Sequence, residues 1–217
     1  MKTYLLLFAL ILSAPATLAG EPDDFDQLFM IDEVSEGQLR FLAAGQARSK
    51  NIHGHLNHIT ILESSLHSGW VQLQQCHTGI DPVSRAAITY QPDRIRNLRV
   101  TTVEHIDQAW IEGANVELKG VRPDAFLCIS ADTKAFSTDE SGGFILRNGP
   151  YMRKFLDGYY PLRLELTVDY PANLIRYTHS VPEQQEGFDV FNGEGLIRIN
   201  TLFEGRLMTN LFFEYML

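Results

Sequence analysis

Alternation of apolar and polar residues in the segment 161–170 is the feature that most constrains the fold of this chain. In PLRLELTVDY, Leu162, Leu164 and Leu166 share one parity, and charged or polar residues lie between them. Because successive side chains of a β-strand point to opposite faces, this pattern predicts a strand with one buried and one solvated face. Weaker versions of the same pattern occur at 58–62, 69–76, 86–91, 95–103, 125–131, 143–149, 175–181, 196–203 and 206–217.

Turn-forming residues separate these segments. Gly, Pro, Asp or Asn occur between them in DPVS, QPDR, EGAN, DESGG and NGEG, which are residues that tight turns favour. No long amphipathic helix pattern lies between the segments, and this favours antiparallel sheet over alternating strands and helices. We therefore predict an all-β, antiparallel, β-sandwich-like fold. One short helical segment is predicted near 151–157, where Tyr151 and Phe155 have helical spacing.

The stretch 132–143, DTKAFSTDESGG, divides the patterned part of the chain in two. We predict a β unit at 51–135, which contains both cysteines, and a second β unit at 142–217. The pattern is compatible with two packed units and with one continuous sandwich. Residues 20–50 are weakly patterned and are predicted to be an N-terminal extension or linker.

Residues 1–19, MKTYLLLFALILSAPATLA, have the pattern of a secretory signal peptide. Lys2 precedes an apolar run, and a signal peptidase could cut after the small residues Thr17 and Ala19, or alternatively after Ala14 and Ala16. The run is shorter than the roughly 20 apolar residues of a membrane-spanning helix. We therefore predict an exported protein, periplasmic or secreted, that is soluble and has no membrane span after cleavage.

The chain is acidic, with a formal net charge of −9. Cleavage after Ala19 removes Lys2 and no acidic residue, so the mature protein is one unit more negative. Binding to nucleic acid needs clustered Lys and Arg that neutralise phosphates, so no nucleic-acid partner is predicted. The expected partner is a protein or a small-molecule ligand of the cell envelope, whose identity the sequence does not give.

Cys76 and Cys128 are the two cysteines of the chain, and both lie in predicted strands. In an oxidising compartment such a pair usually forms a disulfide. We predict this bridge, which would close a loop of about 50 residues and contribute about 2–4 kcal/mol. An alternative, in which Cys76 and the adjacent His77 form a metal or nucleophile pair, is disfavoured because neighbouring strand side chains point to opposite faces.

Five of the seven histidines lie in a short part of the chain. In IHGHLNH, an extended backbone places His53 and His55 on one side and His58 on the other. Imidazoles are good ligands for zinc and copper, but no H-E-x-x-H or C-x-x-C motif accompanies them. Folding would have to supply a further ligand from His77, Asp81 or elsewhere. One interpretation is a metal site that includes His53, His55 and His58; the other is a polar loop with incidental imidazoles.

Two further groups of residues, one cationic and one aromatic, are candidates for ligand binding. Arg94 and Arg96 share a strand face and could hold a carboxylate or phosphate. Folding could add Arg153 to this cationic patch. The simpler interpretation is the solvated, protected side of a strand. Tyr159 and Tyr160 follow Gly158 in a turn and are candidates for a sugar or peptide surface.

Motifs of common enzymes are missing from the sequence. It contains no phosphate-binding loop, dinucleotide-binding glycine pattern or serine nucleophile elbow. The sequence therefore favours a non-catalytic binding or envelope-assembly component. Two alternatives remain: a metal-handling protein that uses the 53–58 cluster for zinc or copper, and a hydrolase whose carboxylates carry no local signature. No other cofactor is predicted.

Overall fold

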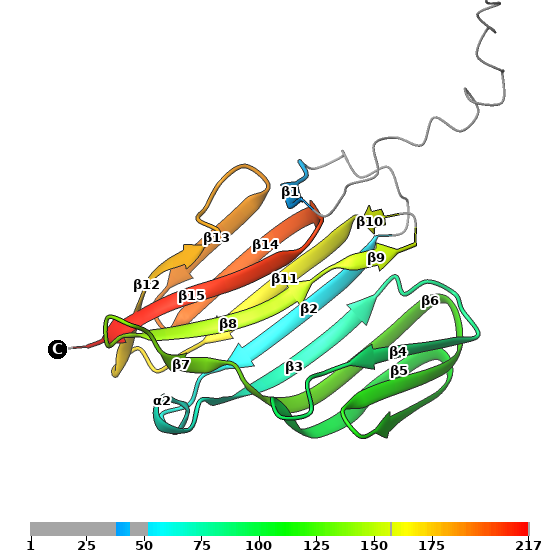
Figure 1. Cartoon of the computed structure of the whole chain (residues 1–217), viewed down its shortest axis with the longest axis horizontal. Helices are drawn as coiled ribbons and strands as arrows, with labels where there is room; N and C mark the ends of the chain where they lie inside the picture. Colours follow the sequence, from blue (N-terminus) through cyan, green and yellow to red (C-terminus); the bar gives the residue numbers. More distant parts are fainter. Residues whose placement is uncertain (1–37, 44–51, 157, 217) are drawn as a thin grey trace, which may run out of the picture. The chain divides into compact units, whose positions relative to one another are not determined.

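The computed structural model describes residues 38–43, 52–156 and 158–216, whose regular secondary structure is almost entirely β-strand (Figure 1). The predicted signal peptide, 1–19, and most of the predicted extension, 20–50, lie outside the described residues. All described residues belong to one compact unit. Among them, no helix combines the length and the apolar character needed to cross a membrane.

The larger sheet contains nine of the described strands. They are β1 (Arg40–Phe41), β2 (His53–Thr60), β3 (Trp70–Thr78), β4 (Arg85–Thr89), β5 (Ile95–Glu112), β6 (Asn115–Lys134), β11 (Leu162–Asp169), β13 (Phe188–Gly193) and β14 (Leu196–Glu204). Their order is β1–β14–β11–β2–β3–β6–β4, with β13 paired to β14 and β5 paired to β6. The pairs are antiparallel except β2 with β11, which are parallel. Strands from both predicted units, 51–135 and 142–217, therefore belong to this one sheet.

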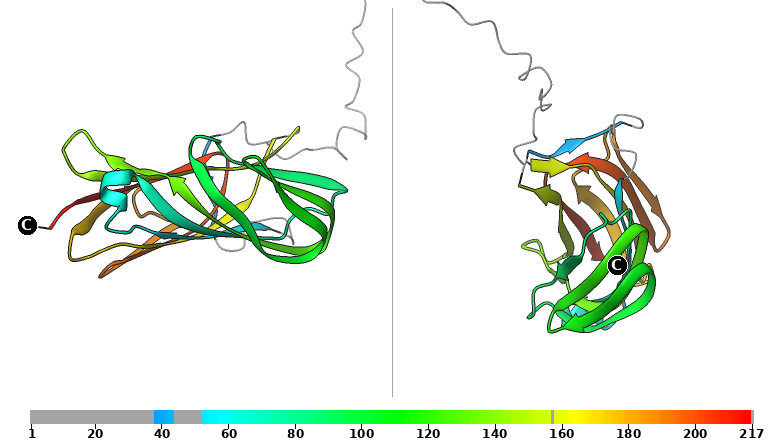
Figure 2. Two further views of the ribbon diagram at one scale, coloured as in Figure 1. Left: turned by 90° about the horizontal axis from the view of Figure 1, so that it is seen from below. Right: turned by 90° about the vertical axis from the view of Figure 1, so that its right-hand side faces the viewer.

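Two smaller sheets complete the described strands. The four-stranded sheet contains β7 (Phe136–Thr138), β8 (Phe144–Tyr151), β12 (Ile175–Val181) and β15 (Leu207–Tyr215), in the order β12–β15–β8–β7. The two-stranded sheet pairs β9 (Arg153–Phe155) with β10 (Gly158–Tyr160). Figure 2 shows the same strands from two further sides.

The core combines side chains of the two larger sheets. Leu164 of β11 and Ile199 of β14 are fully buried in the same apolar cluster as Leu146 of β8 and Leu211 of β15. Because inward residues of two sheets share one cluster, the sheets pack face to face as in a β-sandwich. This confirms the predicted all-β, sandwich-like class.

Strand β11 shows why the alternating sequence folds in this way. Leu162, Leu164 and Leu166 are buried, whereas Arg163 and Glu165 are exposed. The inward face removes apolar surface from water, which stabilises the fold by roughly 25 cal/mol for each Å² buried. The outward face keeps its charges solvated, as the sequence pattern predicts.

The short helix predicted near 151–157 is wrong. Strands β8 and β9 occupy the described part of this segment, and Lys154 lies opposite Tyr159 in the β9–β10 hairpin. Gly158, with φ of 132°, adopts a conformation that other residues rarely adopt and allows the chain to reverse. Pairing across the hairpin therefore replaces the hydrogen bonds of a helical turn. The described helix is instead α2 (Ser65–Ser68), between β2 and β3.

The predicted bridge between Cys76 and Cys128 is present. The two residues lie directly opposite each other on β3 and β6, with Cα atoms 4.1 Å apart. Since side chains alternate along β3, the bridge lies on the face of the sheet opposite that of His77. The alternative in which Cys76 and His77 act together therefore has no geometric basis.

Candidate metal centre

Three histidines from β2 and β3 gather on the inward face of the larger sheet. His53 and His55 are two residues apart on β2, and His77 of β3 lies directly opposite His55 in the antiparallel register. Each ring offers a nitrogen, and these three nitrogens lie within 4.8 Å of one another. Residues from two neighbouring strands thus converge on one point.

A glycine between the two histidines of β2 allows this approach. Gly54 points to the outward face, opposite Thr78 of β3. A Cβ atom at position 54 would lie 2.5 Å from the Thr78 hydroxyl oxygen, which is closer than atoms can pack. The sequence H-G-H therefore keeps β2 close to β3 while presenting both imidazoles inward.

The imidazole rings are spaced closely enough to share a small ion. His53 Nε2 lies 3.2 Å from His77 Nδ1, and the ring centroids of His55 and His77 are 4.4 Å apart. Zinc–nitrogen bonds of about 2.0–2.1 Å place adjacent nitrogens of a tetrahedral site roughly 3.4 Å apart. The His53–His77 spacing is close to this value, and all three nitrogens lie within 4.8 Å of one another.

Two ring nitrogens in the cluster are buried without a partner. His55 Nδ1 and His77 Nε2 have no hydrogen-bond partner within residues 38–43, 52–156 and 158–216. More than nine in ten buried polar groups have a partner, and leaving one unsatisfied costs about 1–3 kcal/mol. A bound ion or an ordered water molecule at His55 Nδ1 would remove this cost there, whereas an ion shared with His53 through His77 Nδ1 would leave His77 Nε2 without a partner.

Burial keeps the three imidazoles neutral. Desolvation lowers the pKa of His53 to about 4, helped by the nearby Arg153 charge. It also lowers the pKa of His55 to about 3 and that of His77 well below its usual value of 6.5. The neutral ring is the form that binds metal, so at neutral pH these residues need lose no proton to act as ligands.

We expect the metal-free protein to lose stability as the pH falls from about 6.5 to about 4. The unfolded chain takes up protons near the ordinary histidine pKa of about 6.5, whereas folded His53 stays neutral down to about 4. The unfolded state then binds more protons, so the free energy of unfolding falls as the pH falls. Urea unfolding of chelator-treated protein checks this, with His55→Asn expected to show a weaker dependence. An unchanged midpoint across this pH range would contradict the prediction.

Polar side chains continue the cluster along the inward face. Asn57 and Gln75, the next inward pair of β2 and β3, are buried. The Asn57 Nδ2 donates to the Tyr151 hydroxyl at 2.5 Å, and the Tyr90 hydroxyl donates to Gln75 Oε1 at 2.5 Å. The ring of Tyr151 lies 5.7 Å from that of His55, so β8 of the opposing sheet covers the histidines.

Arg153 of β9 follows Tyr151 by two residues. Its Nη2 donates to Asp81 Oδ1 at 2.6 Å, and its side chain is only 11% exposed. The rings of Phe155 and Tyr160 lie 5.5 and 5.7 Å from the guanidinium group, which fixes its position. Asp81, one of the residues considered as a further ligand, is thus paired with Arg153.

His58 does not join the cluster, although the sequence places it among the candidate ligands. It lies on the outward face of β2, as the alternation predicts, and its side chain is 43% exposed. Its Nε2 contacts Asp169 Oδ2 at 2.5 Å. The structure therefore brings together His53, His55 and His77, with His77 in the place proposed for His58.

The candidate Arg and Tyr residues do not form one patch. Arg94 is exposed, and the Arg96 guanidinium lies 4.2 Å above the ring of Trp70 at the first residue of β3. The histidines lie at the other end of that strand, about 20 Å away at 3.3 Å per residue. Tyr159 and Tyr160 lie on β10 beside the cationic residues of β9.

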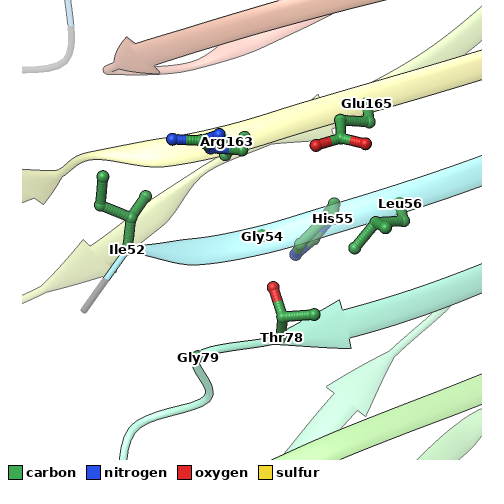
Figure 3. A pocket seen from close by; sticks show the side chains of 8 residues that line it. All are labelled: Ile52, Gly54, His55, Leu56, Thr78, Gly79, Arg163 and Glu165. Atoms are coloured by element: carbon green, nitrogen blue, oxygen red, sulfur yellow. The ribbon is translucent and has the colours of Figure 1, made fainter. Parts of the chain in front are cut away.

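Figure 3 shows a depression on the outward side of the same part of the sheet. Its volume is about 460 Å³, and its lining includes Thr78, Arg163 and Glu165. Because Gly54 has no side chain, the depression also reaches His55, which Figure 3 shows behind the ribbon of β2.

Comparisons with known proteins do not assign a family. No protein-family model matches the chain, and no curated protein is similar to it in sequence. Structures of an M1 zinc metallopeptidase from Deinococcus radiodurans are similar at low level: one with a Tyr-Ser-Ala substrate has 14% identity and a TM-score of 0.41, and another has a TM-score of 0.39. These matches cover 76% of this chain and 42% of the peptidase chain, so this protein spans less than half the length of that enzyme.

Proposed function

We propose that this protein is an exported, non-catalytic metal-binding protein in which His53, His55 and His77 hold one zinc or copper ion. The observation that supports it most strongly is the convergence of three ring nitrogens within 4.8 Å on a buried face. Imidazole nitrogen suits both metals. Three protein ligands leave at least one coordination position open.

The neighbours of the cluster show that these histidines are unusual for their position. Across the sheet, His55 and His77 lie in one row with Leu164 of β11 and Leu127 of β6, both fully buried. Leucines in that row would bury apolar surface without unsatisfied nitrogens. The imidazoles therefore cost stability in the metal-free protein, and a bound ion would offset this cost.

Export is the second part of the proposal and depends on the signal-peptide pattern of 1–19. The disulfide between Cys76 and Cys128 is consistent with an oxidising compartment, where such bridges persist. A metal-binding protein in the cell envelope would carry or buffer zinc or copper there. No observation on the described residues specifically favours the hydrolase alternative.

Titration of untagged, chelator-treated protein tests this function. We expect one equivalent of zinc or copper to bind per chain and the melting temperature to rise with metal concentration, because binding to the folded state alone stabilises it. His67→Ala is a matched control, since it removes an imidazole outside the cluster. Binding no tighter than that of an unrelated histidine-containing protein would overturn the proposal.

A further inference from the structure

We infer that the metal held by His53, His55 and His77 is bound together with a small carboxylate, which also accepts hydrogen bonds from Arg153. This inference rests on the proposed function and names the ligand that completes the same site. It follows from the charge of the site, from the unused donors of Arg153 and from the open coordination position.

The charge of the site calls for an anion. The three imidazoles are neutral, and the positive charge of Arg153 is matched by Asp81 at 2.6 Å. A divalent cation would therefore bring two uncompensated positive charges into a partly buried place. Buried charge is costly unless it is paired. A carboxylate would halve the excess and, unlike a bound water molecule, would do so without first releasing a proton.

Arg153 has donors that the described residues do not use. Its Nε and Nη1 atoms are buried and have no hydrogen-bond partner within the described ranges, although Nη2 is bonded to Asp81. Arginine forms strong, charge-assisted hydrogen bonds with carboxylates. Phe155 and Tyr160 hold the guanidinium group in place, so these donors are positioned before a ligand arrives.

Arg153 is also near the histidines. It lies two residues beyond Tyr151, whose ring centroid is 5.7 Å from that of His55. Three nitrogen ligands leave the fourth position of a tetrahedral site open. One oxygen of a carboxylate can fill this position while the other accepts from Arg153. A bound carboxylate thus satisfies the metal and the arginine at once.

Cobalt(II)-loaded protein provides the test, because the visible spectrum of cobalt changes with its fourth ligand. We expect acetate to change this spectrum in a saturable way with one site per metal. Arg153→Gln should weaken acetate binding about tenfold or more, the effect of losing a charged hydrogen bond, while one cobalt still binds per chain. Arg153→Lys keeps the charge and the Asp81 partner. Its affinity for acetate should lie between that of the wild type and that of Arg153→Gln. Arg163→Gln, on the exposed outward face of β11, is the matched control.

A second arm identifies the source of the carboxylate. A dipeptide with a free C-terminus is compared with its C-terminally amidated form and with acetate. Saturable binding of acetate or of the free dipeptide supports the inference, and binding by the dipeptide alone assigns the carboxylate to a peptide end. Equal binding of the amidated form would overturn it.

The two proposals fail in different ways. Absence of stoichiometric cobalt binding would overturn the proposed function. Stoichiometric cobalt with a spectrum that does not respond to carboxylates would overturn only the inference. An undiminished acetate response in both Arg153→Gln and Arg153→Lys would also overturn the inference and leave the proposed function standing. Circular dichroism of each variant confirms that the comparison is between folded proteins.

Discussion

Replacing His77 with alanine is expected to lower the affinity for zinc by about 100-fold or more. Changing even an outer partner of a metal ligand typically costs 10–100-fold, and loss of a direct ligand costs at least as much. His77 is central to the cluster, since its Nδ1 lies 3.2 Å from His53 and its ring lies 4.4 Å from that of His55. Competition with a coloured zinc chelator measures the change.

The control for this experiment is His58→Ala. His58 is on the same strand as His53 and His55 but faces outward and contacts Asp169, so zinc affinity should stay at the wild-type value. Urea unfolding of both metal-free variants separates loss of binding from loss of folding. Wild-type affinity in folded His77→Ala, or an equal loss in His58→Ala, would show that the ion binds elsewhere.

Removing the disulfide is expected to have the largest effect on stability. Cys76→Ala combined with Cys128→Ala should lower the free energy of unfolding by about 2–4 kcal/mol, because the bridge limits the unfolded chain over a loop of roughly 50 residues. Zinc affinity should be retained, since the bridge and His77 lie on opposite faces of β3. Urea unfolding and zinc titration of the same variant measure both quantities.

Reduction of the wild-type protein is the companion experiment. A reducing agent should shift the unfolding midpoint of the wild type toward that of the double variant and leave the variant itself unchanged. The backbone ladder between β3 and β6 remains in both proteins. An unchanged midpoint on reduction would show that the bridge does not form in the protein in solution.

The strands were predictable because their signal is local. Leu162, Leu164 and Leu166 alternate with polar residues, and this period defines a half-buried strand wherever it is placed in the fold. The pairing of strands is not local. Nothing in the sequence of β2 or β11 specifies that they pair in parallel, with His55 opposite Leu164. The helix wrongly predicted near 151–157 has the same cause. The spacing of Tyr151 and Phe155 fits a helical turn as well as it fits strands, and the pairing of β9 with β10 decides between them.

The candidate site was predictable to a similar extent. The alternation correctly places His53 and His55 together and His58 apart. The contribution of His77 depends on the register of β3 against β2, and that of Arg153 depends on how the β9–β10 hairpin packs. One sequence signal does point to the region: Asn57 and Gln75, like the histidines, are polar residues on strand faces that continue with apolar residues such as Ile59 and Leu73. Such residues on an inward face indicate a polar region within the core.

The arrangement of the strands has a consequence for the order of folding. β2 and β3 are consecutive and joined by the short segment that contains α2, so the hairpin that contains all three histidines is a local structure. The entropy lost on closing a loop increases with its length, and contacts between distant segments form slowly. Pairing of β2 with β11, and the arrival of Tyr151 and Arg153, require a much longer part of the chain. We therefore expect the imidazoles to meet before the cover over them is complete, so that an ion of the proposed site would enter a partly folded chain that later encloses it.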